Sequence, residues 1–360
     1  MTTPPSLPPN EKSLPEYTEE VRRAPVIRWY RTKVPSREMK AVYERSDLLG
    51  AVQTLGFLAI WGLTFTAALL SAIYLPWYAT LGFIFLHGMV VSFFMNGVHE
   101  LGHGTVFKTR WLNTFFVRVY AFLGWINHEH FQNSHQRHHR YTLHPPDDLE
   151  VVLPMRLVLR DLLERGIVMP HHLWGKIRGT ARLSCGRFEG EWEQTMFPEG
   201  DEKARRPVIR WARALYAGHL GILLVSIAMG WWLLPVLTTF SPFYGGWLHM
   251  LCNATQHLGL CDHDPDYRVN SRTFTCSPLL GFLYWQMNYH IEHHMYAAVP
   301  CYRLAKLHRL IRHDLPPTPH GLLACWREIY GIQKRQEADP EYQYRPPLPA
   351  SVTAEAVRSG

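Results

Sequence analysis

Long runs of apolar residues alternate with polar segments along this 360-residue chain. Residues 54–75 and 77–98 contain no charged side chain and are separated only by Pro76. Each run has 22 residues, and a helix needs about 20 residues to cross the hydrocarbon core of a bilayer. A second apolar block, 215–258, is interrupted at 238–242. The pattern predicts an all-α integral membrane protein with four spans in two hairpins, over about 54–75, 77–98, 215–237 and 239–258.

The polar segments predict the orientation of these spans. Basic residues are concentrated before the first hairpin, between the hairpins and after the second. The positive-inside rule therefore predicts that both termini and the middle segment are cytoplasmic. Contact with anionic lipid accounts for the net charge of +7, so no nucleic-acid partner is expected. We predict a disordered tail at 1–20, one membrane domain over 21–335 and a loose tail at 336–360.

Histidine is unusually abundant, with 21 residues, and it is clustered. The chain contains H-E-L-G-H at 99–103, H-Q-R-H-H at 135–139, N-A-T-Q-H at 253–257 and H-I-E-H-H at 290–294. Side chains at i, i+3 and i+4 share one face of a helix, so each cluster can direct its imidazoles at one point. A neutral imidazole is a good ligand for iron, zinc and copper. The candidate ligands are His99, His103, His135, His138, His139, His257, His290, His293 and His294.

The predicted topology brings these clusters together. His99 directly follows the second span, His257 lies at the end of the fourth, and the other two clusters lie in cytoplasmic segments. All four therefore meet at the cytoplasmic membrane surface, where we expect a helical cap to carry them. Nine imidazoles exceed the roughly four to six ligands that one metal takes, so two metal ions are expected. The ligand type excludes calcium and magnesium.

The three histidine boxes, with V-P-C-Y-R-L-A-K-L-H at 299–308, resemble the membrane fatty acid desaturase/hydroxylase superfamily over about 45–315. The resemblance implies that the nine histidines bind two iron ions, that Asn253 holds a metal-bound water, and that O2 is the co-substrate. The first box, H-x-x-x-H, is similar to that of acyl-lipid desaturases, which argues against an acyl-CoA substrate.

The resemblance implies an O2-dependent desaturase acting on an aliphatic substrate, with a fatty acyl or lipid chain as the first candidate. A hydroxylase of the same superfamily, acting on an alkyl chain or a small molecule, is the alternative. The sequence contains no H-P-G-G haem motif, so a separate electron donor of the ferredoxin or cytochrome b5 type is expected. The bacterial inner membrane and the endoplasmic reticulum both remain possible locations.

Acidic residues beside the clusters are candidates for orienting the ligands. Metal-bound imidazoles usually donate their other ring N–H to an acceptor, and Glu100, Asp147, Asp148 and Glu292 are placed to accept. H-E-L-G-H alone also matches the zinc-peptidase signature, in which the glutamate is the general base. That alternative leaves seven clustered histidines unexplained. A metal transporter is disfavoured because its polar groups would lie near the middle of the membrane.

Overall fold

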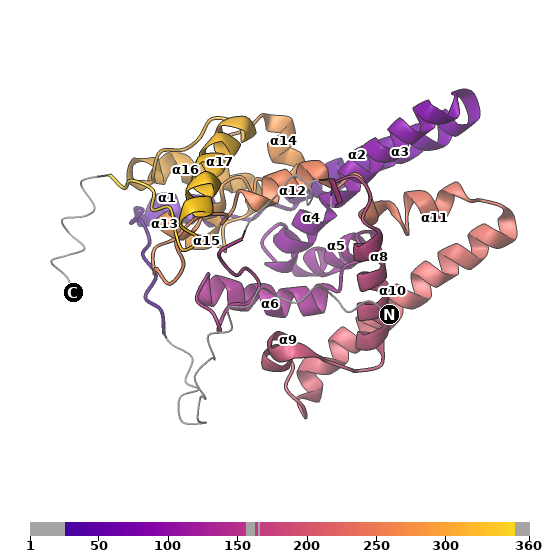
Figure 1. Ribbon diagram of the computed structural model, residues 1–360, viewed down its shortest axis with the longest axis horizontal. Helices are drawn as coiled ribbons and strands as arrows, with labels where there is room; N and C mark the ends of the chain where they lie inside the picture. The colour runs from indigo at the N-terminus through magenta and orange to yellow at the C-terminus, as the bar shows by residue number, and fades with distance from the viewer. Residues whose placement is uncertain (1–25, 156–162, 165, 350–360) are drawn as a thin grey trace.

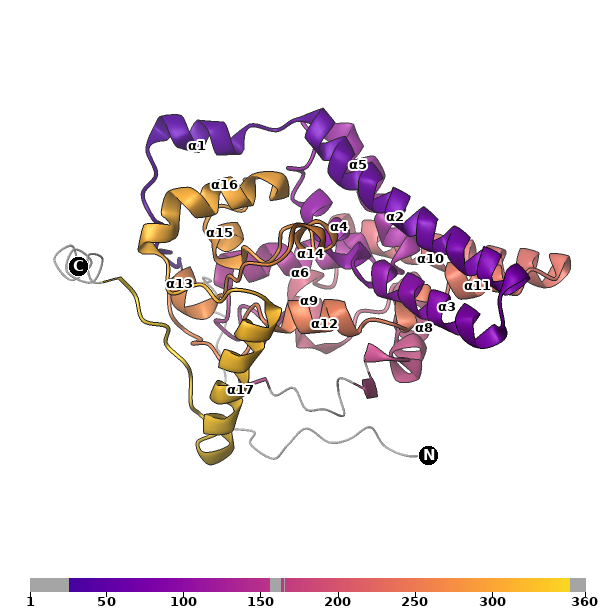
Figure 2. The same cartoon turned by 90° about the horizontal axis from the view of Figure 1, so that it is seen from above.

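The computed structural model describes residues 26–155, 163, 164 and 166–349, and within these ranges the chain is helical without a regular strand. Two apolar hairpins extend from the same side of a compact helical cap (Figures 1 and 2). The first hairpin consists of α2 (Asp47–Tyr74) and of α3 (Trp77–Ser92), which continues into α4 (Phe94–Gly102). The second begins with α10 (Glu202–Met229). The predicted disordered tail, 1–20, lies outside the described residues.

Local sequence explains where the helices of the first hairpin begin and end. The Ser46 hydroxyl accepts a hydrogen bond from the Leu49 amide and caps the N-terminus of α2. Leu75 precedes Pro76 and has extended backbone angles, as expected because a proline disfavours helical geometry in the residue before it. Pro76 then caps α3. The single proline between two uncharged runs therefore produces the hairpin that the sequence predicts.

The second hairpin differs from the prediction. Its first helix begins at Glu202 rather than near residue 215, and it ends at Gly230, which has φ 68°. The region expected as a fourth continuous span contains shorter pieces instead: α11 (Leu233–Leu237), the 3-10 turn η2 (Ser241–Phe243) and α12 (Trp247–Ala254). Pro235 and Pro242 interrupt this region, and a proline supplies no amide for helical hydrogen bonds. Within the described part of the chain, three helices are long and apolar enough to cross a membrane: Asp47–Tyr74, Trp77–Gly102 and Glu202–Met229.

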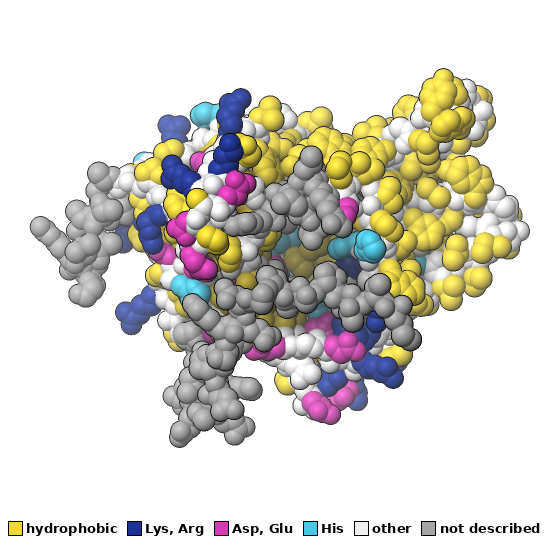
Figure 3. Space-filling model, in the orientation of Figure 1, with side chains coloured by type: hydrophobic (Ala, Val, Ile, Leu, Met, Phe, Trp, Pro, Cys, Tyr) yellow, Lys and Arg dark blue, Asp and Glu magenta, His cyan; other side chains and the backbone are white. Residues whose placement is uncertain are grey.

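The outer surfaces of the hairpins are apolar. Hydrophobic side chains cover the region of both hairpins, whereas charged side chains gather over the cap (Figure 3). Ile73 and Ile227 are each 70% exposed, which is costly in water but favourable in lipid. Aromatic residues lie at both hairpin tips, as they do at membrane interfaces; they are Tyr74, Trp77, Tyr78, Trp231 and Trp232. The chain is therefore a membrane protein.

Two buried histidines connect neighbouring segments at the hairpins, and His87 links the first hairpin to the second. The two ring nitrogens of His87 lie 2.9 Å from the Thr64 hydroxyl and 2.9 Å from the Leu237 carbonyl. His219 is 3.1 Å from both the Thr239 hydroxyl and the Phe122 carbonyl. These side chains are satisfied by helix-to-helix hydrogen bonds, which lowers the cost of placing them in the membrane.

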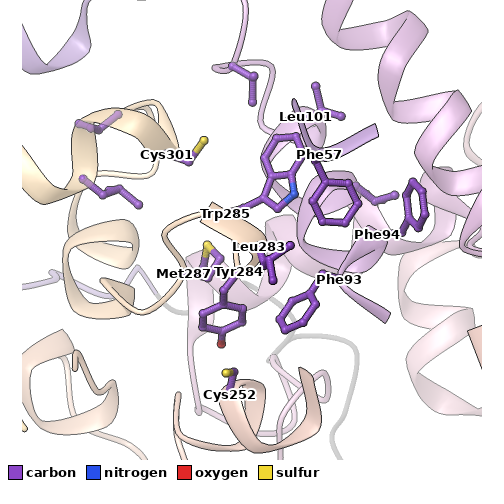
Figure 4. Close-up of a cluster of buried hydrophobic side chains, with 14 of the residues drawn as sticks. Phe57, Phe93, Phe94, Leu101, Cys252, Leu283, Tyr284, Trp285, Met287 and Cys301 are labelled. Carbon is purple, nitrogen blue, oxygen red and sulfur yellow. The ribbon is translucent and has the colours of Figure 1, made fainter. Parts of the chain in front are cut away.

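The cap is built from short helices that enclose the histidine clusters. A buried aromatic cluster, which includes Phe57, Phe93, Phe94 and Trp285, packs the base of the first hairpin against it (Figure 4). The remaining elements are α1 (Ser36–Tyr43), α5 (Arg110–Leu123), α6 (His128–Tyr141), α8 (Pro170–Ser184), α9 (Gly190–Met196), α13 (Tyr267–Asn270), α14 (Pro278–Leu283), α15 (His290–Met295), α16 (Cys301–Ile311), η3 (Arg312–Asp314) and α17 (Leu322–Ala338).

The described segments near both chain ends pack on the cap. Trp29 stacks on Tyr267 with ring centroids 4.2 Å apart. Within the predicted loose tail, α17 extends to Ala338, and the Tyr344 amide then donates to the Gly259 carbonyl at 2.9 Å. The part of this tail up to residue 349 is therefore in contact with the cap, and 350–360 lie outside the described residues.

A buried carboxylate fixes the N-terminal segment to the cap. Asp314, 2% exposed, accepts hydrogen bonds from the Tyr30 and Thr32 hydroxyls, both at 2.6 Å, and pairs with Arg268. Thr32→Val removes one of these donors while preserving shape. We expect the free energy of unfolding to fall by about 2 kcal/mol, the usual range for a hydrogen bond to a charged group. The thermal midpoint in detergent measures this loss, Thr318→Val is the control, and an unchanged midpoint would contradict the prediction.

Candidate metal centre

Four segments of the cap bring the nine predicted histidines together. They come from the end of α4, from α6, from the turn after α12, and from α15. Their ligand atoms form two groups, and within each group all atoms lie within 4.8 Å of one another. The five-histidine group is His99, His103, His135, His139 and His293, and the four-histidine group is His138, His257, His290 and His294. No sequence-predicted histidine is left outside the groups.

Helix geometry explains why adjacent residues serve different groups. On α6, His135 and His139 are one turn apart and belong to the five-histidine group, whereas His138 belongs to the four-histidine group. On α15, His293 and His294 are likewise divided. Because neighbouring residues on a helix point about 100° apart, an H-x-x-H-H box can supply both groups at once.

The Nε2 atoms converge inside each group. In the five-histidine group, His139 Nε2 lies 2.9 Å from His135 Nε2 and 3.0 Å from His293 Nε2. In the four-histidine group, His290 Nε2 lies 2.9 Å from His257 Nε2 and 3.1 Å from His294 Nε2. Two nitrogens about 2.1 Å from one ion, at roughly a right angle, would be about 3 Å apart. The spacing therefore suits imidazoles that share a metal ion.

Carboxylates lie next to the outer ring nitrogens of three members of the five-histidine group. His99 Nδ1 lies 2.9 Å from Glu100 Oε1, and His293 Nδ1 lies 3.4 Å from the same oxygen. His135 Nδ1 lies 2.8 Å from Glu150 Oε1. A carboxylate at Nδ1 fixes the tautomer that leaves the Nε2 lone pair free for a metal.

The four-histidine group has acceptors of three kinds. His138 Nδ1 donates to Asp148 Oδ2 at 2.8 Å, and Asp148 is fully buried. His257 Nδ1 lies 2.7 Å from the Asn270 backbone carbonyl. His294 Nδ1 lies 3.2 Å from the Thr142 hydroxyl.

Only some of the acidic residues singled out in the sequence contact the histidine groups. Glu100 and Asp148 do. Asp147 instead lies 3.4 Å from Arg137, because it points out of the turn that buries its neighbour. Glu292 turns away from the centre, accepting from the Thr273 hydroxyl and contacting His308 Nδ1, each at 2.5 Å. Glu150 was missed, since it lies 11 residues beyond the second box in a loop that no motif marks.

Asn253, the candidate for holding a metal-bound water, lies beside the centre. It is on the last turn of α12, one turn before His257. Its side chain lines a cavity of about 500 Å³ together with His99, His138 and His290. It therefore faces the space beside both histidine groups.

Burial keeps the imidazoles neutral. Desolvation, reinforced by neighbouring histidines, holds the pKa values of His135, His139, His293 and His294 well below the usual value. His138 is the exception: burial alone would lower its pKa, but the charge and hydrogen bond of Asp148 raise it. Neutral imidazole is the form that binds metal.

The donor set fits metal ions. Seven of the nine histidines are buried, and uncompensated buried nitrogen atoms are costly. Among the described residues, His103 Nε2 has no hydrogen-bond partner, which suits a nitrogen directed at a metal ion, whereas the outer Nδ1 atoms of His139 and His290 have no acceptor. The carboxylates next to the histidines accept from the outer ring nitrogens and leave the centre to imidazole nitrogen. Such an all-nitrogen set suits iron, zinc or copper.

The fold and the site define a membrane protein with a histidine-rich centre at the base of apolar hairpins. The family model for fatty acid desaturases matches residues 75–325, more than half of the chain, so the chain belongs to this family of oxidoreductases. The superfamily resemblance of the histidine boxes is thereby confirmed.

Two curated relatives are desaturases. An acyl-lipid (8-3)-desaturase of Thraustochytrium sp is 22% identical over 298 residues, which cover 71% of this chain and 65% of that protein. A dihydrorhizobitoxine desaturase of Bradyrhizobium elkanii is 24% identical over 246 residues, covering 64% of this chain and 67% of that protein. The chain thus spans about two thirds of the length of each relative.

Proposed function

We propose that this protein is an O2-dependent, di-iron desaturase that introduces a double bond into an aliphatic substrate. The observation that carries the proposal is the division of nine histidines into adjacent groups of five and four. The fatty acyl chain of a lipid is the substrate class that the family and the acyl-lipid relative suggest. The same centre would also support hydroxylation, because both reactions begin by removing hydrogen from a C–H bond.

The five-histidine group and the four-histidine group would each hold one iron ion. When bound, the two ions would supply the capacity to activate O2 with electrons from a donor. The chain's own residues hold the imidazoles in place. Glu100, Glu150 and Asp148 accept the outer ring protons, and burial keeps water away from the histidines. Asn253 would position a water molecule beside the centre.

The arrangement of Glu100 argues against a zinc protease. A general base in an H-E-x-x-H site must reach the water on the open side of the metal. Glu100 is instead fully buried and lies 2.9 Å and 3.4 Å from the Nδ1 atoms of His99 and His293. Glu100 therefore contacts the outer nitrogens of the two histidines, on the side away from the metal site.

We propose that both termini and the cap face the cytoplasm. Support comes from the basic segments on the cap side of the apolar hairpins and from the contacts of residues 29 and 344 with the cap. The α11–η2–α12 segment would return the chain to the cap and complete a fourth crossing. The breaks between its three helical pieces are tolerable because it packs against α10 and α3.

Electrons would come from a separate protein. A ferredoxin or a cytochrome b5-type carrier would fit a basic cytoplasmic surface.

The proposal is tested by producing the protein in a host with defined lipids. We expect about two iron ions per chain and, by mass spectrometry, a product that has lost two hydrogen atoms. A product that has gained one oxygen atom would favour the hydroxylase alternative. Bound zinc with peptide cleavage, or no oxidised product from lipids or small carboxylates in the presence of a competent donor, would refute the proposal.

A further inference from the structure

The cavity beside the histidine groups has an unexpected chemistry. Its volume is about 500 Å³, within the range of about 300–1,000 Å³ for small-molecule sites. It is lined by His99, His135, His138 and His290 and by residues of α8 between Gly175 and Leu183. A substrate in this cavity would lie between the metal ligands and α8.

The cavity is lined by both apolar and polar side chains, and apolar atoms make up the larger part of its surface. An aliphatic segment would therefore fit against the apolar surface, whereas the polar groups need polar partners, because an unpaired polar group against a methylene chain is costly. Asn96 illustrates the point: it is 4% exposed, it lines the cavity, and its Oδ1 atom has no hydrogen-bond partner among the described residues. The cavity therefore suits a molecule that has an apolar part and polar groups as well.

The charges of the cavity wall are not all balanced internally. Arg182 forms a bidentate pair with Glu193, at 2.5 Å and 2.6 Å. Glu150 accepts from Ser134 at 2.5 Å and from His135 at 2.8 Å. Both carboxylates that line the cavity are therefore engaged, while Lys176 forms no ion pair with any residue that the structure describes.

Lys176 is poorly placed for a purely structural role. It is half-buried on α8, and desolvation lowers the pKa of its ammonium group below the usual value. An ammonium group that loses water without gaining an anion is destabilising. An anionic ligand group would provide the missing partner. Arg178, on the same helix, is exposed and lies outside the cavity.

We infer that the substrate carries an anionic head group, a carboxylate or a phosphate, which Lys176 binds while the aliphatic part extends toward the histidines. This inference rests on the proposed function and narrows its substrate class. The substrate would be amphiphilic, with an anionic group at one end of its aliphatic part. Asn96 Oδ1 would accept a hydrogen bond from a donor on the same molecule.

Calorimetric titration of the iron-loaded protein in detergent tests this inference with hexanoate, hexyl phosphate and hexanol as probes. We expect the better of the two anions to bind at least about tenfold more tightly than hexanol, as a charge-assisted contact would give. Which anion binds better identifies the head group. Lys176→Met should abolish the preference and Lys176→Arg should retain it, whereas Arg178→Met should bind like the wild type. Lys176→Gln provides a second neutral variant in case the methionine variant does not fold.

Equal binding of all three probes to the wild type, or an unchanged anion preference in both neutral variants, would overturn the inference. Iron content and oxidised products are measured on the same preparations. A Lys176-dependent anion preference without oxidation would support the anion site and contradict the proposed function. Oxidation of lipid chains without any anion preference would support the proposed function and contradict the anion site.

Discussion

His138→Ala is expected to abolish oxidation while the protein still inserts into the membrane. The substitution leaves three imidazoles in the four-histidine group and removes the ring that Asp148 supports. Even the loss of an outer partner of a ligand costs about 10- to 100-fold in metal affinity or activity, so losing the ligand should cost more. We expect iron to fall from about two ions toward about one per chain, measured together with product formation.

The matched comparison is His293→Ala, which reduces the five-histidine group to four imidazoles. His293→Ala should also abolish oxidation. It should release less iron than His138→Ala, because four imidazoles remain in its group instead of three. His313→Ala, at an exposed position outside both groups, is the control. Retained turnover in either ligand variant would show that its group is not required for the reaction.

The overall architecture was predictable from the sequence where hydrophobicity and helical spacing alone determine where helices begin and end. The uncharged runs on either side of Pro76 form the first hairpin close to the expected boundaries. The second hairpin was harder because one apolar block extends over 215–258, and hydrophobicity does not show where a helix ends inside such a block. Gly230 ends α10 through its left-handed conformation, a local backbone property that an apolar pattern hides.

The histidines were predictable from the sequence, whereas the residues that support them were not. Their i, i+3 and i+4 spacing identifies a shared helical face without knowledge of the fold. Glu150, Thr142 and the Asn270 carbonyl approach the rings only after the loops around them have folded. A backbone carbonyl carries no sequence signal at all. Lys176 is a similar case, because its importance depends on a cavity formed by distant segments.

Asp148→Asn is expected to weaken iron binding at the four-histidine group by about 10- to 100-fold, the usual cost of losing a ligand's outer partner. Asp148 Oδ2 accepts from His138 Nδ1 and from the Leu143 amide, both at 2.8 Å, and Oδ1 accepts from the Glu150 amide at 2.9 Å. An asparagine keeps the shape of the side chain but removes the negative charge that makes the His138 imidazole a stronger electron-pair donor to a metal ion. Iron retention during titration with a chelator measures the change.

Asp147→Asn is the matched control because Asp147 is adjacent in sequence and was an equal candidate from the motif. Its carboxylate is half-buried and lies 3.4 Å from Arg137, away from the ligands, and surface pairs of this kind contribute little. Its iron retention should equal that of the wild type. Equal loss of iron in both variants would mean that the acidic turn acts through its overall charge, whereas loss confined to Asp148→Asn would tie metal affinity to the carboxylate that accepts from His138 Nδ1.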